Sequence, residues 1–318
     1  MRTTIEREAS CPQPALPTLA PSAPGHGLAE TMSKLQERAR VARMRMEHRR
    51  AAEPVQFFLP GMEAFVRAMP NHIARSSLFA PVARGRKRFY NEEPLITRSD
   101  VVLTYTGEQL DESQADVALQ LIYEARCIPL GVPIRINRAA FLRAIGRSTG
   151  KHDYEWLHRV MKAFYKASFI IEVKRRDGST KYCVGDTRAF RIVADLDYDG
   201  DNERYTVTLD PRWRQLFENQ EFALIDWNKR LQIGRGQDMA KALQRLIAAS
   251  ADPVQAYAMS WLKDKMQYAS PMRKFREAVS AAVDELKRVG VIARGEIDVG
   301  RRGSAQLVLW VTRARASG

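Results

Sequence analysis

Cysteine is scarce in this sequence. The 318 residues contain three cysteines, Cys11, Cys127 and Cys183, an odd number without the spacing of a metal site, which suits a reducing compartment. Apolar runs such as 306–311 fall far short of the roughly 20 residues that span a bilayer. The first residues also lack the apolar core of a signal peptide. We therefore expect a cytoplasmic protein without a membrane partner.

Catalytic groups are also few. There are five histidines, none at the spacing of metal ligands or of a catalytic triad, and the acidic residues form no set distinct from surface ion pairs. Residues 195–206 begin like an EF-hand calcium loop, but Thr206 replaces the final bidentate carboxylate and strands are expected on both sides. Residues 146–152 have one residue too few between the glycines for a nucleotide-phosphate loop. We expect no enzymatic activity, no cofactor and no metal.

Positive charge, in contrast, is abundant. The chain has 51 Lys and Arg against 37 Asp and Glu, a formal net charge of +14. Such an excess attracts polyanions more than it stabilises any fold, so nucleic acid is the expected partner. Residues 1–28, rich in Pro, Ala and Ser, predict a disordered tail. Residues 29–66 predict a basic helix and a linker, and the arginines of that helix either contact phosphates or lie in solvent.

Residues 67–210 predict a first domain built around a helix-turn-helix. Apolar spacing and turn residues indicate, in order, a strand at 101–105, a helix at 111–127, a short strand at 134–136, helices at 138–145 and 152–167, and a hairpin at 170–184 around Asp177-Gly178. This order is that of a winged helix-turn-helix, with the basic hairpin as the wing. A further hairpin is expected within 190–209.

Residues 211–318 repeat this plan. Helices are expected at 238–250, 259–266 and 271–289, a short strand at 254–257, and a last hairpin at 291–312. The predicted fold class is α+β: tandem winged helix-turn-helix domains that follow a disordered and helical basic N-terminal region.

The second helix of each pair is predicted to carry the DNA contacts. Apolar residues at helical spacing occupy one face of it, and cations lie near the opposite side. The hairpins add further cations, with Lys181 beside those of the first. The predicted DNA-binding residues are Lys151, His152, Arg159, Lys162, Lys174, Arg175, Arg176, Arg273, Lys274, Arg276, Arg301 and Arg302. The alternative is an ordinary solvated surface, the commoner place for charged residues.

Two stretches resemble the TrfA-type plasmid replication initiators. They are RAMPNHIARSSLF, Arg67–Phe79, and LTYTGEQL, Leu103–Leu110, within a likeness that extends from about Gln56 to the C-terminus. The resemblance implies a bacterial, plasmid-associated protein that binds direct repeats, called iterons, in double-stranded origin DNA. It also implies opening of adjacent DNA and recruitment of the host replicative helicase or its loader. Contacts with single-stranded origin DNA and self-association remain open.

The resemblance also implies a contact with the host sliding clamp. The initiators carry a Gln-Leu-Ser-Leu-Phe type motif upstream of the Arg-Ala-Met-Pro-Asn segment, and Gln56, Phe57, Phe58 and Leu59 stand in its place here. Pro60 occupies the position where an aromatic residue is expected. A short extended segment of this kind can place apolar anchors in a partner's pocket. Alternatively, Phe57, Phe58 and Leu59 pack on their own first domain.

Two other functions compete with replication initiation. A winged-helix repressor would bind operator repeats without engaging the replication machinery. A metal-dependent DNA-processing enzyme would use the acidic cluster between Asp195 and Asp201. Loss of activity on chelation would identify the enzyme, and maintenance of a plasmid through its origin would separate an initiator from a repressor.

Overall fold

The computed structural model describes Glu37, Leu59 and residues 62–82, 87–175, 177–186, 189–217, 221–300 and 303–312. The chain divides into two compact units, residues 1–55 and 56–318. The tail expected at 1–28 lies outside the described residues, as does the basic helix expected at 29–52, except for Glu37, which is helical and exposed.

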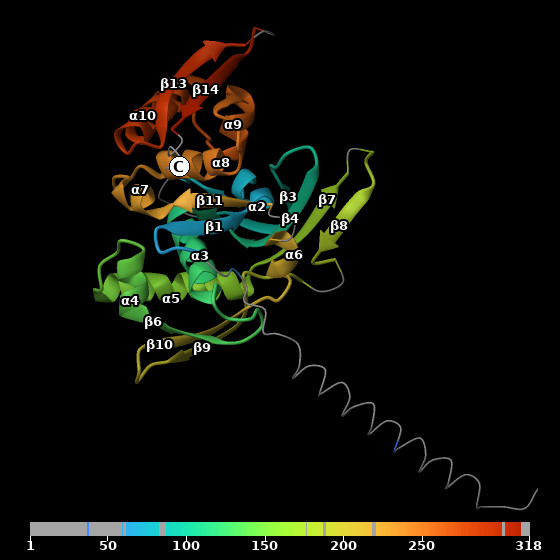
Figure 1. Cartoon of the computed structure of the whole chain (residues 1–318), viewed down its shortest axis with the longest axis vertical. Coiled ribbons are helices and arrows are strands. Elements are labelled where there is room, and N and C mark those ends of the chain that lie inside the picture. Colours follow the sequence, from blue (N-terminus) through green and yellow to red (C-terminus); the bar gives the residue numbers. More distant parts are fainter. Residues whose placement is uncertain are drawn as a thin grey trace, which may run out of the picture. The chain divides into compact units, whose positions relative to one another are not determined.

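Helices and strands are mixed throughout the second unit (Figure 1). Its first part contains β1 (Val66–Pro70), α2 (Asn71–Arg75), β2 (Phe79–Ala80), β3 (Phe89–Leu95), β4 (Val101–Glu108), β5 (Leu110–Asp111), α3 (Glu112–Ala125), β6 (Ile134–Asn137), α4 (Arg138–Ala144), α5 (Lys151–Lys166), β7 (Ser168–Lys174), β8 (Thr180–Val184), β9 (Val193–Asp199) and β10 (Arg204–Leu209). Its second part contains α6 (Trp213–Phe217), β11 (Phe222–Asp226), α7 (Trp227–Gln232), α8 (Asp238–Ala248), β12 (Val254–Ala258), α9 (Met259–Lys265), α10 (Met272–Arg288), β13 (Ile292–Val299) and β14 (Ala305–Val311).

Two modules in this unit share one order of helix, strand, two helices and hairpin. Module 1 consists of α3, β6, α4, α5, β9 and β10, and its antiparallel sheet has the order β6-β10-β9. Module 2 consists of α8, β12, α9, α10, β13 and β14, and its antiparallel sheet has the order β12-β14-β13. In both, the strand before the helix pair is paired with the last strand of the hairpin. The sheets are therefore equivalent in topology.

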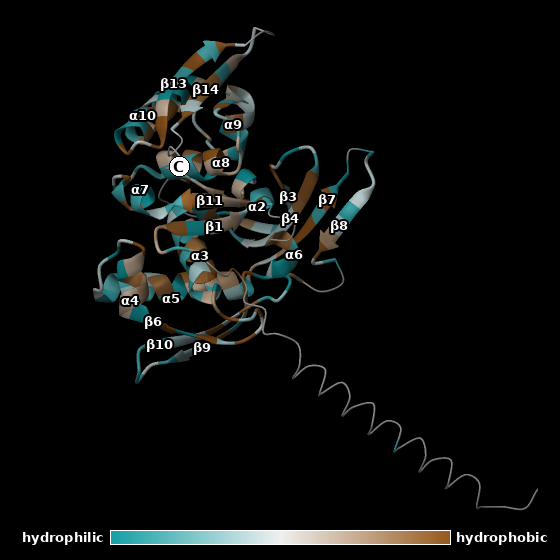
Figure 2. Ribbon diagram, viewed as in Figure 1, coloured by the Kyte–Doolittle hydropathy of each residue, from teal (hydrophilic) through white to brown (hydrophobic). Residues whose placement is uncertain are grey.

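Apolar spacing explains the longest helix of each module. In α5 the buried residues are those predicted from the sequence, Leu157, Val160, Met161 and Phe164. In α10 they include the four predicted ones, Phe275, Val279, Val283 and Leu286. Apolar and hydrophilic residues accordingly lie side by side along both helices (Figure 2). One face of each helix packs on its core, and the other remains available for contacts.

The hairpin that follows α5 is not the wing of module 1, contrary to the sequence prediction. β7 pairs with β4, and β7 and β8 complete a four-stranded sheet of order β3-β4-β7-β8. The buried residues of β4 and β7 coincide in register, with Leu103 opposite Ile171 and Val101 opposite Val173. This match places the apolar faces of both strands on one core. The hairpin that pairs with β6 is instead β9–β10.

A two-stranded sheet separates the modules (Figure 1). β1 and β11 are antiparallel, with α3 packed on β1 and α8 packed on β11. The first hydrophobic core continues beyond Asp210, where the sequence predicted the first domain to end, because Trp213, Ala223 and Trp227 belong to it. The second core begins at Ile233. In the described part of the chain, no helix is both long and apolar enough to cross a membrane.

A buried charge cluster joins α3 to the helices around module 2. Glu112 accepts hydrogen bonds from Arg230 at 3.0 Å and from Arg245, and none of these three side chains is exposed. Asp116, also on α3, accepts from Arg230 at 2.5 Å and from Lys241 at 2.6 Å. Breaking such a cluster is costly, since each charge left behind would be buried without a partner.

Lys265 on α9 is also fully buried and makes the stability of the fold depend on pH. Its Nζ donates to the carbonyl of Ser76 at 3.1 Å. Burial, reinforced by the nearby Arg245, lowers the pKa of Lys265 to about 7. The folded protein therefore releases this proton near pH 7, whereas the unfolded chain keeps it until about pH 10.4. Between these pH values the unfolded chain binds one proton more than the folded protein. The free energy of unfolding therefore increases as the pH rises from 7 to about 10, and it decreases as the pH falls back to 7.

We predict that Lys265→Met abolishes an increase of up to about 1.4 kcal/mol per pH unit in the free energy of unfolding between pH 7.5 and 9.5. Urea unfolding of the parent and variant across this range measures it. Lys166→Met, which replaces an exposed lysine on α5, is the matched control and should keep the parent's pH dependence. An unchanged slope in Lys265→Met would show that Lys265 titrates normally.

Candidate nucleic-acid interface

The turn between α4 and α5 is held by side chains at the start of α5. The guanidinium of Arg147 lies 3.4 Å from the ring centroid of Trp156 and donates to Asp153 at 2.8 Å. The hydroxyl of Ser148 also donates to Asp153. These bonds, that from Ser148 first, lower the pKa of Asp153. The start of α5 is thereby fixed relative to the preceding helix.

The α5 residues predicted to bind DNA are all exposed: Lys151, His152, Arg159 and Lys162. Lys151, Arg159 and Lys162, together with Glu155, recur at spacings of four, four and three residues and so share one face of the helix. Lys151 is 4.0 Å from Glu155, and this pair is open to solvent. Such a pair is weak, so it leaves Lys151 available to a phosphate.

An aromatic cluster that the sequence reasoning missed fixes α5 against the hairpin β9–β10. The Arg138 guanidinium lies 3.8 Å from the ring centroid of Tyr154 and donates to the Tyr198 hydroxyl at 2.8 Å. His158 stacks on Tyr205, with ring centroids 6.0 Å apart. Burial, with Lys162 and Arg138 nearby, lowers the pKa of His158. The spacing of the tyrosines and the histidine along the helix and the strands was the available sequence signal for this cluster. It was not sufficient, because the contacts between these residues depend on how the strands pair.

The hairpin β9–β10 of module 1 is acidic. Asp199 at its tip accepts hydrogen bonds from the backbone N–H groups of Asp201 and Asn202 at 3.0 and 3.1 Å, so it stabilises the turn. The exposed acidic residues of the hairpin are Asp195, Asp197, Asp199, Asp201 and Glu203. This charge repels phosphate, so the cations of α5 are the part of module 1 suited to DNA. Across the described ranges, no group of three or more His, Cys, Asp or Glu residues could hold a metal ion.

The basic residues of β7–β8 are separate from this face. Lys174 and Arg175 lie at the end of β7, and Lys181 lies on β8, in the four-stranded sheet. Arg175 donates to the carbonyl of Thr180 at 2.9 Å, and Lys181 is paired with Glu221 at 2.7 Å. Arg176 lies outside the described residues. The structure therefore does not unite these cations with α5 in one winged module.

In module 2 the predicted residues Arg273, Lys274 and Arg276 are exposed in the first turns of α10. Arg273 is 3.1 Å from Glu277, and both side chains are more than half exposed. Arg294 on β13, which the sequence reasoning did not select, is exposed and lies 4.9 Å from the ring centroid of Trp310. Arg301 and Arg302 lie outside the described residues. The start of α10 thus carries three of the exposed cations of the described module.

Leu59 is the described member of the predicted clamp-binding segment, and Gln56, Phe57 and Phe58 lie outside the described residues. Leu59 is half-buried and packs on the first core. Its backbone N–H donates to the carbonyl of Arg126, at the end of α3, at 2.9 Å. Leu59 therefore has a place on its own domain, as the packing alternative expected for this residue.

Several solved structures are similar to the chain. Domains 2 and 3 of RctB, as a selenomethionine derivative, resemble it with a TM-score of 0.48 and 9% identity over 77% of this chain and 99% of that one. A second structure of these domains has a TM-score of 0.45 and 11% identity, and the match covers 76% of this chain and 97% of that one. The WH1 domain of MSBI1.176, described as a replication protein isolated from a multiple sclerosis patient, has a TM-score of 0.24 and 17% identity. The match covers 34% of this chain and 85% of that one.

No curated protein sequence matches the chain. The TrfA protein family matches it over residues 22–299, which include nearly all of both modules. The chain belongs to the TrfA family of plasmid replication initiators.

Proposed function

We propose that the protein initiates plasmid replication by binding direct repeats, or iterons, in the double-stranded DNA of an origin. Membership of the TrfA family over residues 22–299 is the observation that carries this proposal. The net charge of +14 and the exposed cations of α5 and α10 support it, because DNA affinity depends strongly on phosphate contacts. The protein acts by binding rather than by catalysis and needs no cofactor.

Both modules act as winged helix-turn-helix domains in this proposal. The order helix, strand, two helices and hairpin supports it, since the second helix of such a pair enters the major groove with its first residues toward the bases. In module 2 these residues are Arg273, Lys274 and Arg276. In module 1 they are Lys151 and His152, while the acidic hairpin β9–β10 stays away from phosphates.

Once bound, the protein opens neighbouring DNA and recruits the host helicase or its loader, in the cytoplasm with the plasmid. Contact with single-stranded origin DNA and self-association belong to the same proposal. The test is whether the gene and a neighbouring array of direct repeats sustain an otherwise non-replicating circle in a bacterial host. A repressor would bind the repeats, yet the circle would be lost.

The segment 56–59 binds the host sliding clamp in this proposal. Its likeness to the clamp motif of the family supports the assignment. Because Leu59 packs on the first core and bonds to Arg126, the clamp must either displace this contact or bind around it. If Leu59 must first leave its core, the observed affinity for the clamp equals the intrinsic affinity multiplied by the fraction of molecules in which the segment is free.

Salt dependence measures how much of the surface touches DNA. If both modules contact one duplex, roughly six to ten phosphates are neutralised, and the binding constant should fall about 10³- to 10⁵-fold between 50 and 200 mM salt. Fluorescence anisotropy with one labelled repeat at several salt concentrations gives the slope. A slope equivalent to one or two phosphates would contradict binding through both modules.

The start of α10 should read bases. Arg273→Ala or Lys274→Ala should weaken binding to the cognate repeat by about 1 to 3 kcal/mol if the residue makes a bidentate base contact. Binding to scrambled DNA of equal length should change much less. Lys166→Ala, at the far end of α5, serves as an exposed control and should leave the preference for the repeat intact. Equal losses on both DNAs would mean that Arg273 or Lys274 contacts phosphate alone.

The clamp contact is best tested through Gln56, because Leu59 also packs on its own core. Gln56→Ala should weaken binding to purified sliding clamp more than about tenfold, since loss of a central polar anchor at a small peptide interface costs at least about 1.4 kcal/mol. Affinity for origin repeats and the melting temperature should not change. A parent protein that does not bind the clamp at concentrations up to about tens of micromolar refutes the contact.

A further inference from the structure

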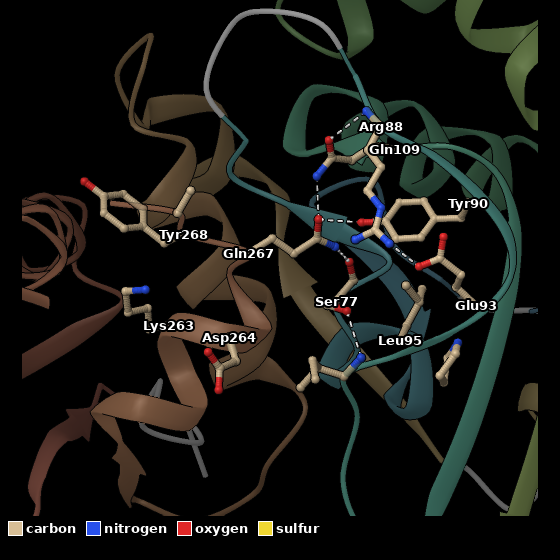
Figure 3. A pocket seen from close by; sticks show the side chains of 13 residues that line it. Ser77, Arg88, Tyr90, Glu93, Leu95, Gln109, Lys263, Asp264, Gln267 and Tyr268 are labelled. Atoms are coloured by element: carbon tan, nitrogen blue, oxygen red, sulfur yellow. Dashed lines mark hydrogen bonds and ion pairs between the residues drawn. The ribbon is translucent and has the colours of Figure 1, made fainter. Parts of the chain in front are cut away.

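Helix α10 is attached at its start to a part of the chain outside module 2. Gln267, in the turn before α10, has a φ of +51°, a left-handed conformation that is uncommon for residues other than glycine. Its Oε1 accepts from the hydroxyl of Tyr90 at 2.8 Å and from the amide of Gln109, and its Nε2 donates to the carbonyl of Ser77 at 2.7 Å (Figure 3). One side chain thus uses three hydrogen bonds to hold this turn to β3, to the residue after β4 and to the segment between α2 and β2.

These bonds lie beside a cleft of about 490 Å³. Arg88, Glu93 and Gln109 line it from the β3–β4 side, and Lys263 and Tyr268 from the α9–α10 side (Figure 3). Gln267 crosses between the two sides next to α10, and Lys265 at the end of α9 crosses beside it to the carbonyl of Ser76.

Helix α7 provides a second attachment, at the end of α10. The Nζ of Lys229 donates to the carbonyl of Gly290 at 2.8 Å, and Arg288 donates to the carbonyl of Gln232 at 2.6 Å. Glu285 accepts from the N–H of Gly234 at 2.7 Å. Hydrogen bonds, that from Arg288 first, lower the pKa of Glu285 to about 2. The last turn of α10 is therefore bonded to α7 and the loop that follows it.

The same helix reaches the helix-turn-helix of module 1. The indole Nε1 of Trp227 donates to the carbonyl of Ala144, the last residue of α4, at 3.0 Å. A Cβ atom placed on Gly146, in the turn before α5, would lie 3.3 Å from the side chain of Leu231. Trp227 and Leu231 therefore contact the end of α4 and the turn before α5, while Lys229 contacts the end of α10. We name Trp227–Gln232 with these contacts the α7 brace.

We propose that the α7 brace and Gln267 hold α5 and α10 at one distance and one rotation relative to each other, which we call a fixed phase. The protein then reads an origin repeat as a single site of fixed spacing. Trp227, Lys229 and Gln267 are positioning residues for this reading. The proposal rests on the proposed function, since it concerns how both modules engage one duplex. One inserted base pair rotates the distal half of a site by about 35° and moves it by about 3.4 Å. Two helices fixed in phase cannot follow this change without losing contacts.

The first test compares DNA sites. Footprinting locates the bases protected by each module, and one base pair is then inserted midway between them. We expect the insertion to weaken binding of the parent protein at least tenfold. In the triple variant Trp227→Phe, Lys229→Met and Gln267→Gly we expect a smaller penalty than in the parent, because the ends of α5 and α10 lose these contacts while the buried ion pairs of Glu112 still join α3 to α8. Phenylalanine keeps an aromatic ring without the N–H donor, and glycine accepts a positive φ, so the changes remove bonds with little strain.

Gln255→Ala is the matched control. Gln255 is a buried amide on β12 of module 2 that donates to the carbonyl of Ile247 at 3.1 Å, away from both attachments. This variant should lose stability and yet keep the full insertion penalty. A triple variant with the parent's penalty, or a control that loses the penalty to the same degree, overturns the proposal.

A second measurement needs no DNA. Spin labels at Lys166→Cys on α5 and Ser280→Cys on α10, both exposed, report the distance between the helices after Cys11, Cys127 and Cys183 are replaced by Ser. We expect a narrow distance distribution in the otherwise unchanged protein and a broad one in the triple variant. Equal widths overturn the fixed phase. A parent protein that binds no origin repeat contradicts the proposed function alone. The widths of the two distance distributions then still show whether the α7 brace and Gln267 fix the helices.

Discussion

The carboxylate of Glu112 is the interaction on which the packing of α3 against α7 and α8 depends. It divides its two oxygens between Arg230 and Arg245, which come from different helices, and all three side chains are inaccessible to water. Arg245 also donates to the carbonyls of Ala74 and Phe79. Loss of a partner in such a group costs about 3 to 5 kcal/mol, because a buried charge remains. α3, α7, α8 and the segment around α2 are thus held by one acidic side chain.

The position of Glu112 follows from local chemistry. Asp111 caps α3 through a reciprocal pair of hydrogen bonds with Gln114, which fixes Glu112 as the first residue of the helix. An acidic residue there is also favoured by the helix dipole. The favourable local position and the long-range ion pairs coincide, an agreement typical of sequences that specify one structure.

Local patterns in the sequence were sufficient for the longer helices and for most strands, but not for the short helices α2, α6 and α7 or for the pairing of the strands. α5 and α10 were predictable because residues such as Leu157 and Phe275 repeat at helical spacing within one segment. The pairing of β7 with β4 rests on a match across about 70 residues between Leu103 and Ile171, which no local pattern contains. β1 and β11 were not predicted, because they pair with each other from distant parts of the chain and no pattern within either segment contains that match. The same limit applies to the interface: exposed cations on α5 could be selected from periodicity, whereas the acidic wing and the α7 contacts depend on the fold.

The two ends of α3 contact different parts of the chain, so the helix can transmit a force from one part to the other. Near its C-terminal end, α3 receives Leu59 at the carbonyl of Arg126, while Arg67 donates to Gln120 at 2.9 Å and lies 3.7 Å from the ring centroid of Tyr123. At its other end, Glu112 holds the two arginines. With 14 residues, the helix is a stiff rod about 21 Å long. A force applied to the chain before Leu59 would therefore be transmitted along α3 to the buried ion pairs of Glu112, between module 1 and module 2.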